Sequence, residues 1–248
     1  MTGRAILSAR GLTIRFGGVI AADGVDLDVI EGEHLAIIGP NGAGKTTFLN
    51  IATGYLKPQA GRVAFLGRDI TAHSPRAITR LGIARAFQIP QLFLEHTVIE
   101  NLLIAAAARV GRLATLRRLE DLPERAEMLR LLELVGARGA AERRATALPE
   151  GLRKLVDIAM ALALKPKLVL MDEPTSGVAS AEKFAVMDVL VAALNAERVT
   201  SVFVEHDMDV VERYASRVAV WSNGRIQTAG PPREVLADPA VIGQVIGL

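Results

Sequence analysis

The chain has 248 residues, 50% of them hydrophobic and 23% charged, and a formal net charge of +2 at pH 7. This length and composition indicate a globular protein with one large or two small domains and a sizeable core. The absence of cysteine excludes disulfides and thiolate metal sites, and the nearly balanced charge with scattered basic residues predicts no nucleic-acid partner.

The first third of the chain has the pattern of strands separated by glycine-rich turns. The apolar or alternating runs are residues 5–16, 23–29, 34–39 and 61–67. A short helix should follow, with Ser74 as its N-cap, Pro75 at its first position and Gly82 beyond its end. We expect an antiparallel sheet near the N-terminus.

The middle of the chain, about residues 97–164, predicts helices. Thr97 and Glu100 form a capping-box pattern, and a further helical run, residues 123–136, begins with proline and ends with glycine. The longest apolar run, residues 102–108, is far shorter than the roughly 20 residues of a membrane-spanning helix. No signal peptide is visible. We therefore expect a soluble intracellular chain that reaches a membrane only through a partner.

The last third alternates strands and helices. Residues 167–172 and 200–206 are apolar runs typical of buried parallel strands, and residues 181–194 between them have helical spacing. Asn223-Gly224 lies between two further strand runs, which predicts a hairpin. The predicted fold is α/β, with a core of alternating strands and helices, an N-terminal antiparallel sheet and an inserted helical block.

A glycine-rich stretch, GPNGAGKTT, lies between a predicted strand and a predicted helix and matches G-x-x-x-x-G-K-T. Glycines let backbone N–H groups curl around a phosphate, and the helix N-terminus adds favourable partial charge. Lys45 can reach β- and γ-phosphates, and the Thr46 hydroxyl suits Mg²⁺. A chance glycine-rich turn is the alternative, and the flanking elements favour a nucleoside triphosphate. The candidate phosphate-binding residues are Gly39, Pro40, Asn41, Gly42, Ala43, Gly44, Lys45, Thr46 and Thr47.

Two carboxylates end the strand over residues 167–172. Asp172 lies at its carboxyl end, where open α/β sheets bind their ligands, and can hold Mg²⁺ through water. Glu173 stands one residue further on, where it can polarise an attacking water as a general base. A surface acidic pair is the alternative. His206 follows a second buried strand and can contact a γ-phosphate or support Glu173, although alone it would indicate a structural or solvated histidine.

With these motifs in this order, the whole chain resembles the ATP-binding subunits of ABC transporters. GPNGAGKTT resembles their Walker A loop, LVLMDE their Walker B strand with its catalytic glutamate, and His206 their switch histidine. Gln88 in RAFQIP resembles the glutamine that reaches Mg²⁺ and links the core to the helical block. Phe16 in RFGG resembles the aromatic residue that stacks on adenine, with an ordinary core phenylalanine as the alternative. The resemblance implies ATP and Mg²⁺ as cofactors and catalytic roles for Gln88, Glu173 and His206.

Within that family the chain is most similar to the LivG-like ATPases of branched-chain amino acid (LIV-type) importers, through the segments after Gln88, around His206 and at the C-terminus. The resemblance implies a peripheral ATPase at the cytoplasmic face of the inner membrane. Its partners would be a second ATPase chain, two permease subunits and, indirectly, a periplasmic solute-binding protein. One ATP-binding domain would span residues 1–248, with a core of about 1–90 and 165–248 and a helical part of about 91–164.

The signature loop, usually close to LSGGQ, departs from the family pattern. The aligned residues are Leu148, Pro149, Glu150, Gly151 and Leu152. Proline removes a hydroxyl and a backbone donor, and glutamate adds negative charge where the partner's phosphate would approach. Ala179 replaces the usual Asp or Asn after Walker B. We hypothesise a heterodimer whose partner supplies a regular signature; alternatively, LPEGL binds through its remaining backbone groups.

Three other functions stay open at this stage. An exporter ATPase for lipid or lipopolysaccharide has similar motifs. A P-loop kinase shares GxxxxGKT but would need an acceptor site and a lid with clustered arginines. An ABC protein acting on DNA or ribosomes usually carries long coiled coils or two ATPase domains in one chain, for which 248 residues leave no room. The transported solute is not encoded, because such subunits do not touch it.

Overall fold

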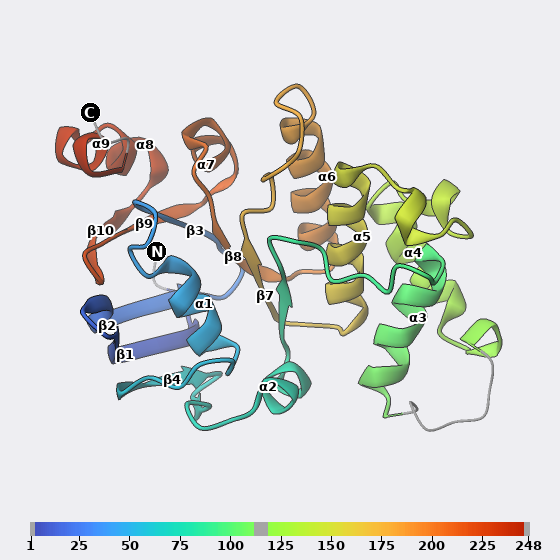
Figure 1. The fold of residues 1–248 in the computed structure, drawn as a ribbon, viewed down its shortest axis with the longest axis horizontal. Coiled ribbons are helices and arrows are strands. Elements are labelled where there is room, and N and C mark those ends of the chain that lie inside the picture. Colours follow the sequence, from blue (N-terminus) through green and yellow to red (C-terminus); the bar gives the residue numbers. More distant parts are fainter. Residues whose placement is uncertain (1–2, 112–118, 246–248) are drawn as a thin grey trace.

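The computed structural model describes residues 3–111 and 119–245, which form two sheets and surrounding helices (Figure 1). The larger sheet has six strands in the order β10-β9-β3-β8-β7-β6. All its neighbouring strands are parallel except β9 and β10. Its strands are β3 (His34–Ile38), β6 (Ile83–Ala86), β7 (Leu168–Asp172), β8 (Thr200–Val204), β9 (Arg217–Ser222) and β10 (Arg225–Gly230).

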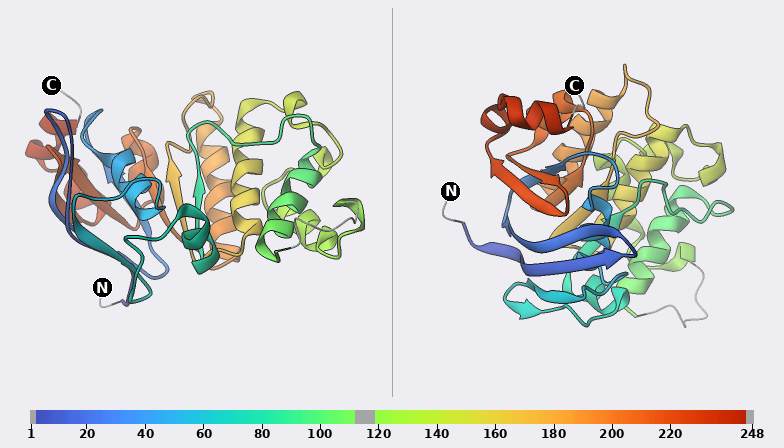
Figure 2. Two further views of the ribbon diagram at one scale, coloured as in Figure 1. Left: turned by 60° about the horizontal axis from the view of Figure 1, so that its bottom comes forward. Right: turned by 60° about the vertical axis from the view of Figure 1, so that its left-hand side comes forward.

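The smaller sheet is antiparallel, has the order β2-β1-β4-β5 and comes from the first third of the chain, as predicted. In Figure 2 its blue and cyan strands lie on one side of the molecule and the green helices on the other. Its strands are β1 (Ala5–Phe16), β2 (Val19–Ile30), β4 (Ala60–Phe65) and β5 (Arg68–Asp69).

The helices cover the parallel sheet and form a separate layer beyond β6 (Figure 1). They are α1 (Lys45–Ala52), α2 (Pro75–Leu81), α3 (Val98–Arg109), α4 (Arg125–Leu134), α5 (Glu150–Ala163), α6 (Lys183–Ala196), α7 (Met208–Tyr214), α8 (Pro232–Leu236) and α9 (Pro239–Val245). Within the described ranges, no helix combines the length and the hydropathy needed to cross a membrane.

Local signals in the sequence set several of these boundaries. The Ser74 hydroxyl accepts a hydrogen bond from the Ala77 amide, which caps α2. Thr97 and Glu100 form both halves of a capping box at α3, with the Thr97 amide 2.7 Å from the Glu100 carboxylate. Asn223 and Gly224 adopt φ angles of 52° and 73° between β9 and β10. That conformation is the one expected for a hairpin with an Asn-Gly turn, so these predictions are confirmed.

The expected helical middle is a set of shorter elements. Helices α3, α4 and α5 are joined by 3-10 turns and irregular segments, while residues 112–118 of the predicted block lie outside the described part. The helix predicted to start with Pro123 begins at Arg125, with Glu124 as its N-cap. Strand β6 was not predicted, because its residues IARA have weak strand propensity. Pairing with the fully buried strand β7 holds β6 in the sheet.

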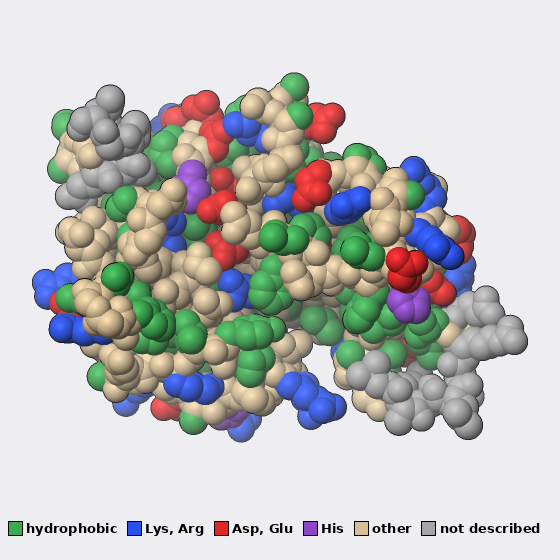
Figure 3. Space-filling view, viewed as in Figure 1, with side chains coloured by type: hydrophobic (Ala, Val, Ile, Leu, Met, Phe, Trp, Pro, Cys, Tyr) green, Lys and Arg blue, Asp and Glu red, His purple; other side chains and the backbone are tan. Residues whose placement is uncertain are grey.

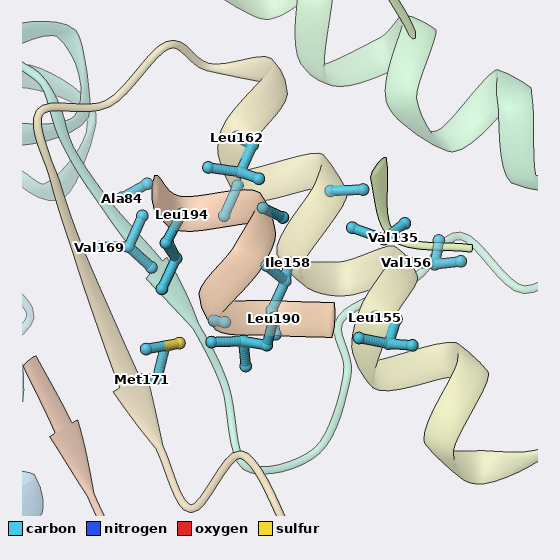
Figure 4. Packing of buried hydrophobic residues seen from close by; sticks show 14 of the residues in the cluster. Ala84, Val135, Leu155, Val156, Ile158, Leu162, Val169, Met171, Leu190 and Leu194 are labelled. Carbon is cyan, nitrogen blue, oxygen red and sulfur yellow. The ribbon is translucent and has the colours of Figure 1, made fainter. Parts of the chain in front are cut away.

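Helix α5 packs against β6 of the parallel sheet and beside α6. Figure 4 shows Ile158 of α5 beside Leu190 of α6, and Leu194 of α6 beside Val169 of β7. All four side chains are almost completely buried. Because a short connection leads from the end of α5 into β7, the N-terminal half of α5 lies beside the carboxyl end of that strand. This packing fixes the start of α5 at the sheet edge where the candidate residues gather.

Candidate functional site

The glycine-rich loop over residues 39–47 connects β3 to α1, as the sequence predicts. Gly39 has a φ angle of 149°, and a Cβ atom there would lie 1.9 Å from the carbonyl oxygen of Trp221. Gly44 has a φ angle of 115°, and its Cβ would lie 1.9 Å from the carbonyl oxygen of Ala21. Neither position accepts a side chain, because backbone approaches on both sides. The loop is therefore held tightly against β9 and β2.

Lys45 is the first residue of α1 and is only 6% exposed. Its ammonium donates hydrogen bonds to the carbonyl oxygens of Gly39 (2.6 Å) and Pro40 (2.9 Å). Burial lowers the pKa of Lys45, while the nearby carboxylates of Glu173 and Asp172 act to raise it. A buried positive charge inside a curled backbone loop suits a phosphate anion.

Asp172, at the carboxyl end of β7, is oriented from two directions. Its Oδ1 accepts a hydrogen bond of 3.3 Å from the Thr46 hydroxyl, and its Oδ2 forms a 3.1 Å ion pair with Arg85. The Arg85 side chain is 7% exposed and also donates to Asn50 of α1. Burial lowers the pKa of Arg85, and Asp172 acts in the opposite direction. Arg85 was not predicted as a site residue. The one indication of its role in the sequence is its charge within the short, otherwise apolar segment of β6.

Glu173 is the point at which three of the predicted residues meet. The Gln88 amide donates to its Oε2 at 2.7 Å, and His206 Nε2 lies 2.9 Å from its Oε1. Glu173 has a φ angle of 49°, which is unusual for a residue with a side chain and marks local strain. Its amide donates to the Val204 carbonyl of β8. The three side chains come from the ends of neighbouring parallel strands.

A buried glutamate supports the histidine segment. Glu205 is 3% exposed, and its carboxylate accepts hydrogen bonds from the amide and hydroxyl of Thr175 and from the His206 amide. These bonds tie the chain after β8 to the chain after β7. The position of His206 beside Glu173 is thus set by backbone contacts as well as by its own ring.

The structure also describes the remaining predicted residues. Phe16 ends β1 and is 47% exposed, which excludes an ordinary core role for its ring. Pro149 is the N-cap of α5 and Glu150 lies in its first turn, with no side-chain cap hydrogen bond. The segment LPEGL therefore forms the N-terminal end of α5. There is room for a side chain at Gly151, because an added Cβ atom would touch only side chains, the nearest at 3.5 Å.

Lys154 and Asp157 are two further charged residues on α5 that the sequence reasoning missed. They are 3% and 7% exposed, although the rest of that helix face is apolar. Lys154 donates to the carbonyl oxygens of Gln88 and Glu173, each at 3.1 Å. Burial raises the pKa of Asp157 to about 6, against the lowering effect of two backbone amides and Lys154. The sequence pattern that could have identified them is a pair of charged residues, three positions apart, on the otherwise apolar face of a predicted helix.

The donor set fits a magnesium nucleotide. The loop offers glycine backbone and a buried ammonium, which suit phosphates. Thr46 and Asp172 offer a hydroxyl and a carboxylate oxygen 3.3 Å apart, and Gln88 carries an amide oxygen on the side chain that bonds to Glu173, the residue after Asp172. Oxygen ligands of this kind are the ones that Mg²⁺ prefers.

The chain is similar to several known proteins. A family model described as ABC transporter matches residues 22–176. The probable branched-chain amino acid transport ATP-binding protein LivG of Methanocaldococcus jannaschii is 38% identical, covering 98% of this chain and 97% of that protein. The high-affinity branched-chain amino acid transport ATP-binding protein LivG of Escherichia coli (strain K12) is 34% identical, with 98% of each covered. The ADP conformation of MJ1267, an ATP-binding cassette of an ABC transporter, has a TM-score of 0.88 and 35% identity, covering 99% of this chain and 100% of that one.

Replacing Asp157 with Asn should alter how stability depends on pH. Folding raises the pKa of Asp157 from 3.8 to about 6. Between those values the native chain holds a proton that the unfolded chain has released, so the free energy of unfolding falls as pH rises. The shift corresponds to about 3 kcal/mol. Across about pH 4 to 7, Asp157→Asn should therefore lose about 3 kcal/mol less stability than the unaltered chain.

Urea unfolding at several pH values measures this difference directly. Asp238→Asn is a matched control, because Asp238 also accepts a backbone hydrogen bond but is exposed. The control should follow the unaltered chain. A constant offset between Asp157→Asn and the unaltered chain at every pH would contradict the prediction.

Proposed function

This chain belongs to the ABC transporter family, and on that basis we propose that it is the ATP-hydrolysing subunit of an importer for branched-chain amino acids or related small polar solutes. The observation that carries the proposal is the Glu173 carboxylate, held between Gln88 and His206 beside the loop of Lys45. The relatives named LivG, matched over nearly their whole length, support the choice of solute.

Under this proposal the nucleotide is held by three groups of residues. The Phe16 ring stacks on adenine, the backbone and Lys45 of residues 39–47 bind the phosphates, and Mg²⁺ is held by Thr46, Gln88 and, through water, Asp172. Bound Mg²⁺ supplies positive charge that offsets the charge of the phosphates. The ion pair with Arg85 fixes the orientation of the Asp172 carboxylate.

Glu173 acts as the general base. Its carboxylate accepts a proton from the attacking water, and the two contacts from Gln88 and His206 fix the direction in which it faces. This arrangement disfavours a P-loop kinase, which has no need for the convergence of these three residues. A lipid or lipopolysaccharide exporter ATPase is the nearest alternative, and it would use the same chemistry.

The partner ATPase is proposed to be a different chain. Pro149 and Glu150 stand at the N-terminal end of α5, where a regular signature would offer a serine hydroxyl and a glycine backbone to the partner's phosphate. Ala179 stands where the family usually carries Asp or Asn, so a further polar group is missing from this chain. A heterodimer would keep one good site, formed by this chain's Lys45, Glu173 and His206 and the partner's signature.

Two permease subunits are the proposed membrane partners, which would place this chain at the cytoplasmic face of the inner membrane. A cavity of about 450 Å³ lies at the amino ends of β6 and β7, opposite the nucleotide side. Figure 3 shows a hollow between the lower part of the molecule and the helices, with basic side chains near its edge. The basic residues of its lining are Arg76, Arg80, Arg109, Lys165 and Lys167.

The charge of this cavity fits an acidic permease segment. Glu127 pairs with Arg109 and Lys165. In the part of the chain that the structure describes, Arg76, Arg80 and Lys167 form no ion pair with an acidic residue. Tyr55 also lines the cavity. Its ring packs edge-to-face on the ring of Phe87, the neighbour of Gln88, with 6.0 Å between the ring centroids. We propose one ATP-binding domain in which a core of about 1–90 and 165–248 and a helical part of about 91–164 enclose this docking cavity.

Replacing Glu173 with Gln should stop hydrolysis and preserve ATP binding. The amide cannot accept the proton of water, so turnover should fall about 100-fold or more, and the ATP-bound pair of chains should persist in size-exclusion chromatography with Mg-ATP. Glu182→Gln, an exposed carboxylate before α6, is the control and should keep full turnover. Unchanged hydrolysis by Glu173→Gln would remove the proposed base.

Mixing with the partner ATPase chain should raise turnover. This chain alone, at dilute protein, should hydrolyse ATP slowly, because each ATP site of a homodimer would be completed by the LPEGL segment of the other copy. Restoring a donor by Pro149→Ser with Glu150→Gly should raise turnover of the chain alone by at least about tenfold. Brisk turnover by the unaltered chain alone would count against the heterodimer.

Reversing charge in the cavity should weaken binding to the permeases alone. Arg76→Glu with Arg80→Glu should reduce recovery of the permease pair in affinity purification, while ATP hydrolysis with the partner ATPase remains unchanged, because both arginines are exposed and lie away from the nucleotide side. Arg62→Glu with Arg68→Glu reverses two exposed charges on the antiparallel sheet and serves as the control. Equal recovery with both double variants would exclude the cavity as the docking site.

A further inference from the structure

Helix α5 carries two buried charges that the proposed hydrolysis does not use. We propose that Lys154 and Asp157 are positioning residues that hold the Gln88 segment and the Glu173 backbone at a fixed distance from each other. The inference rests on the proposed function, because the pair that they position is the general base and its amide partner.

Asp157 fixes the backbone on both sides of Gln88. Its Oδ2 accepts a hydrogen bond from the Phe87 amide at 3.3 Å, and its Oδ1 accepts one from the Gln91 amide at 3.2 Å. The segment between these residues has no helix or strand of its own. One carboxylate therefore supplies the acceptors that a regular element would otherwise supply.

Lys154 joins the same segment to the catalytic strand. Its ammonium donates to the Gln88 carbonyl and to the Glu173 carbonyl, each at 3.1 Å. Glu173 is the residue with a φ angle of 49°, so its peptide needs outside contacts to persist in that conformation. With Lys154 between the two carbonyls, the backbones that carry the Gln88 amide and the Glu173 carboxylate are held together, and the 2.7 Å bond between their side chains follows.

The helix that carries both residues is itself rigidly packed. Figure 4 shows Leu155, Val156 and Ile158, neighbours of these residues in sequence, pointing into the buried cluster. Because α5 begins with LPEGL, a partner's phosphate approaching that end would act on the same rigid helix that holds Gln88 and Glu173. Lys154 and Asp157 thus link the surface lent to the partner with this chain's own general base.

The two charges are costly to keep and are not needed for packing. Each is less than 10% exposed, and apolar residues of similar volume would fill the same space at no electrostatic cost. Their hydrogen bonds go to backbone groups of the nucleotide side. A role in positioning explains why they occupy the apolar face of α5.

Hydrogen exchange of the full chain tests the contact without relying on activity. In Asp157→Asn the side-chain amide group places a donor against one of the two backbone donors, and in Lys154→Gln only one carbonyl can be reached. Both variants should speed exchange in residues 87–91 by about tenfold, with the rest of the chain unchanged. Lys154→Arg, which keeps donors for both carbonyls, should exchange close to the unaltered rate. Controls are Lys57→Met, which removes an exposed lysine–carbonyl bond, and Asp238→Asn.

Kinetics with the partner ATPase chain give the second readout. Both variants should lower kcat by about tenfold while KM for ATP stays within about twofold, because the phosphate-binding loop is untouched and only the Gln88 segment and the geometry of the base change. Unchanged exchange in residues 87–91 would overturn the inference. A rise in exchange spread over the whole chain, in step with a lower thermal midpoint, would also overturn it in favour of a general structural role. If the unaltered pair of chains hydrolyses no ATP, the proposed function fails, and the exchange result still decides whether Lys154 and Asp157 hold the segment.

Discussion

The contact on which the site depends is the Glu173 carboxylate shared between Gln88 and His206. The three residues lie far apart in the chain and meet because β6, β7 and β8 are neighbours in one parallel sheet. Parallel strands present their carboxyl ends at the same edge, so residues that follow each strand meet there. A carboxylate fixed through both oxygens has little freedom to turn away from a reacting water, which is a geometric requirement for a general base.

Around that contact the protein buries several charged side chains, and most of them have an ion-pair or hydrogen-bond partner. Asp172 is matched by Arg85 and Thr46, Glu205 by amides and a hydroxyl, and Lys154 by two carbonyls. Buried charges destabilise a fold unless they are paired or hydrogen-bonded, so their concentration at one edge of the sheet marks where function has taken precedence over packing. Away from that edge, the buried carboxylate of Glu33 is paired with Arg217.

What the sequence predicted well is encoded locally. The loop of Lys45, the capping box of Thr97 and the Asn223 turn each depend on residues within a few positions of one another, and each appears where expected. Arg85, Lys154 and Asp157 could not be assigned in this way, because their partners lie 19 to 87 positions away in the chain. Strand β6 was missed for the same reason, since its neighbour β7 rather than its own composition makes it a strand.

Helix α5 connects the two surfaces that an ABC ATPase must coordinate. Its N-terminal end is the segment LPEGL, which we propose faces the partner ATPase. Its next turn holds Gln88 and Glu173, and the residues just after its end, Leu164 and Lys165, line the basic cavity. Arg109 of α3 donates to the carbonyl of the last helical residue, Ala163, and reaches the same cavity. A packed helix moves as a unit, since its side chains interdigitate with their neighbours at close-packed density. A permease segment docked in the cavity and a phosphate approaching LPEGL would therefore act on opposite ends of one rigid helix. The residues between those ends, on the proposal above, set the position of the base.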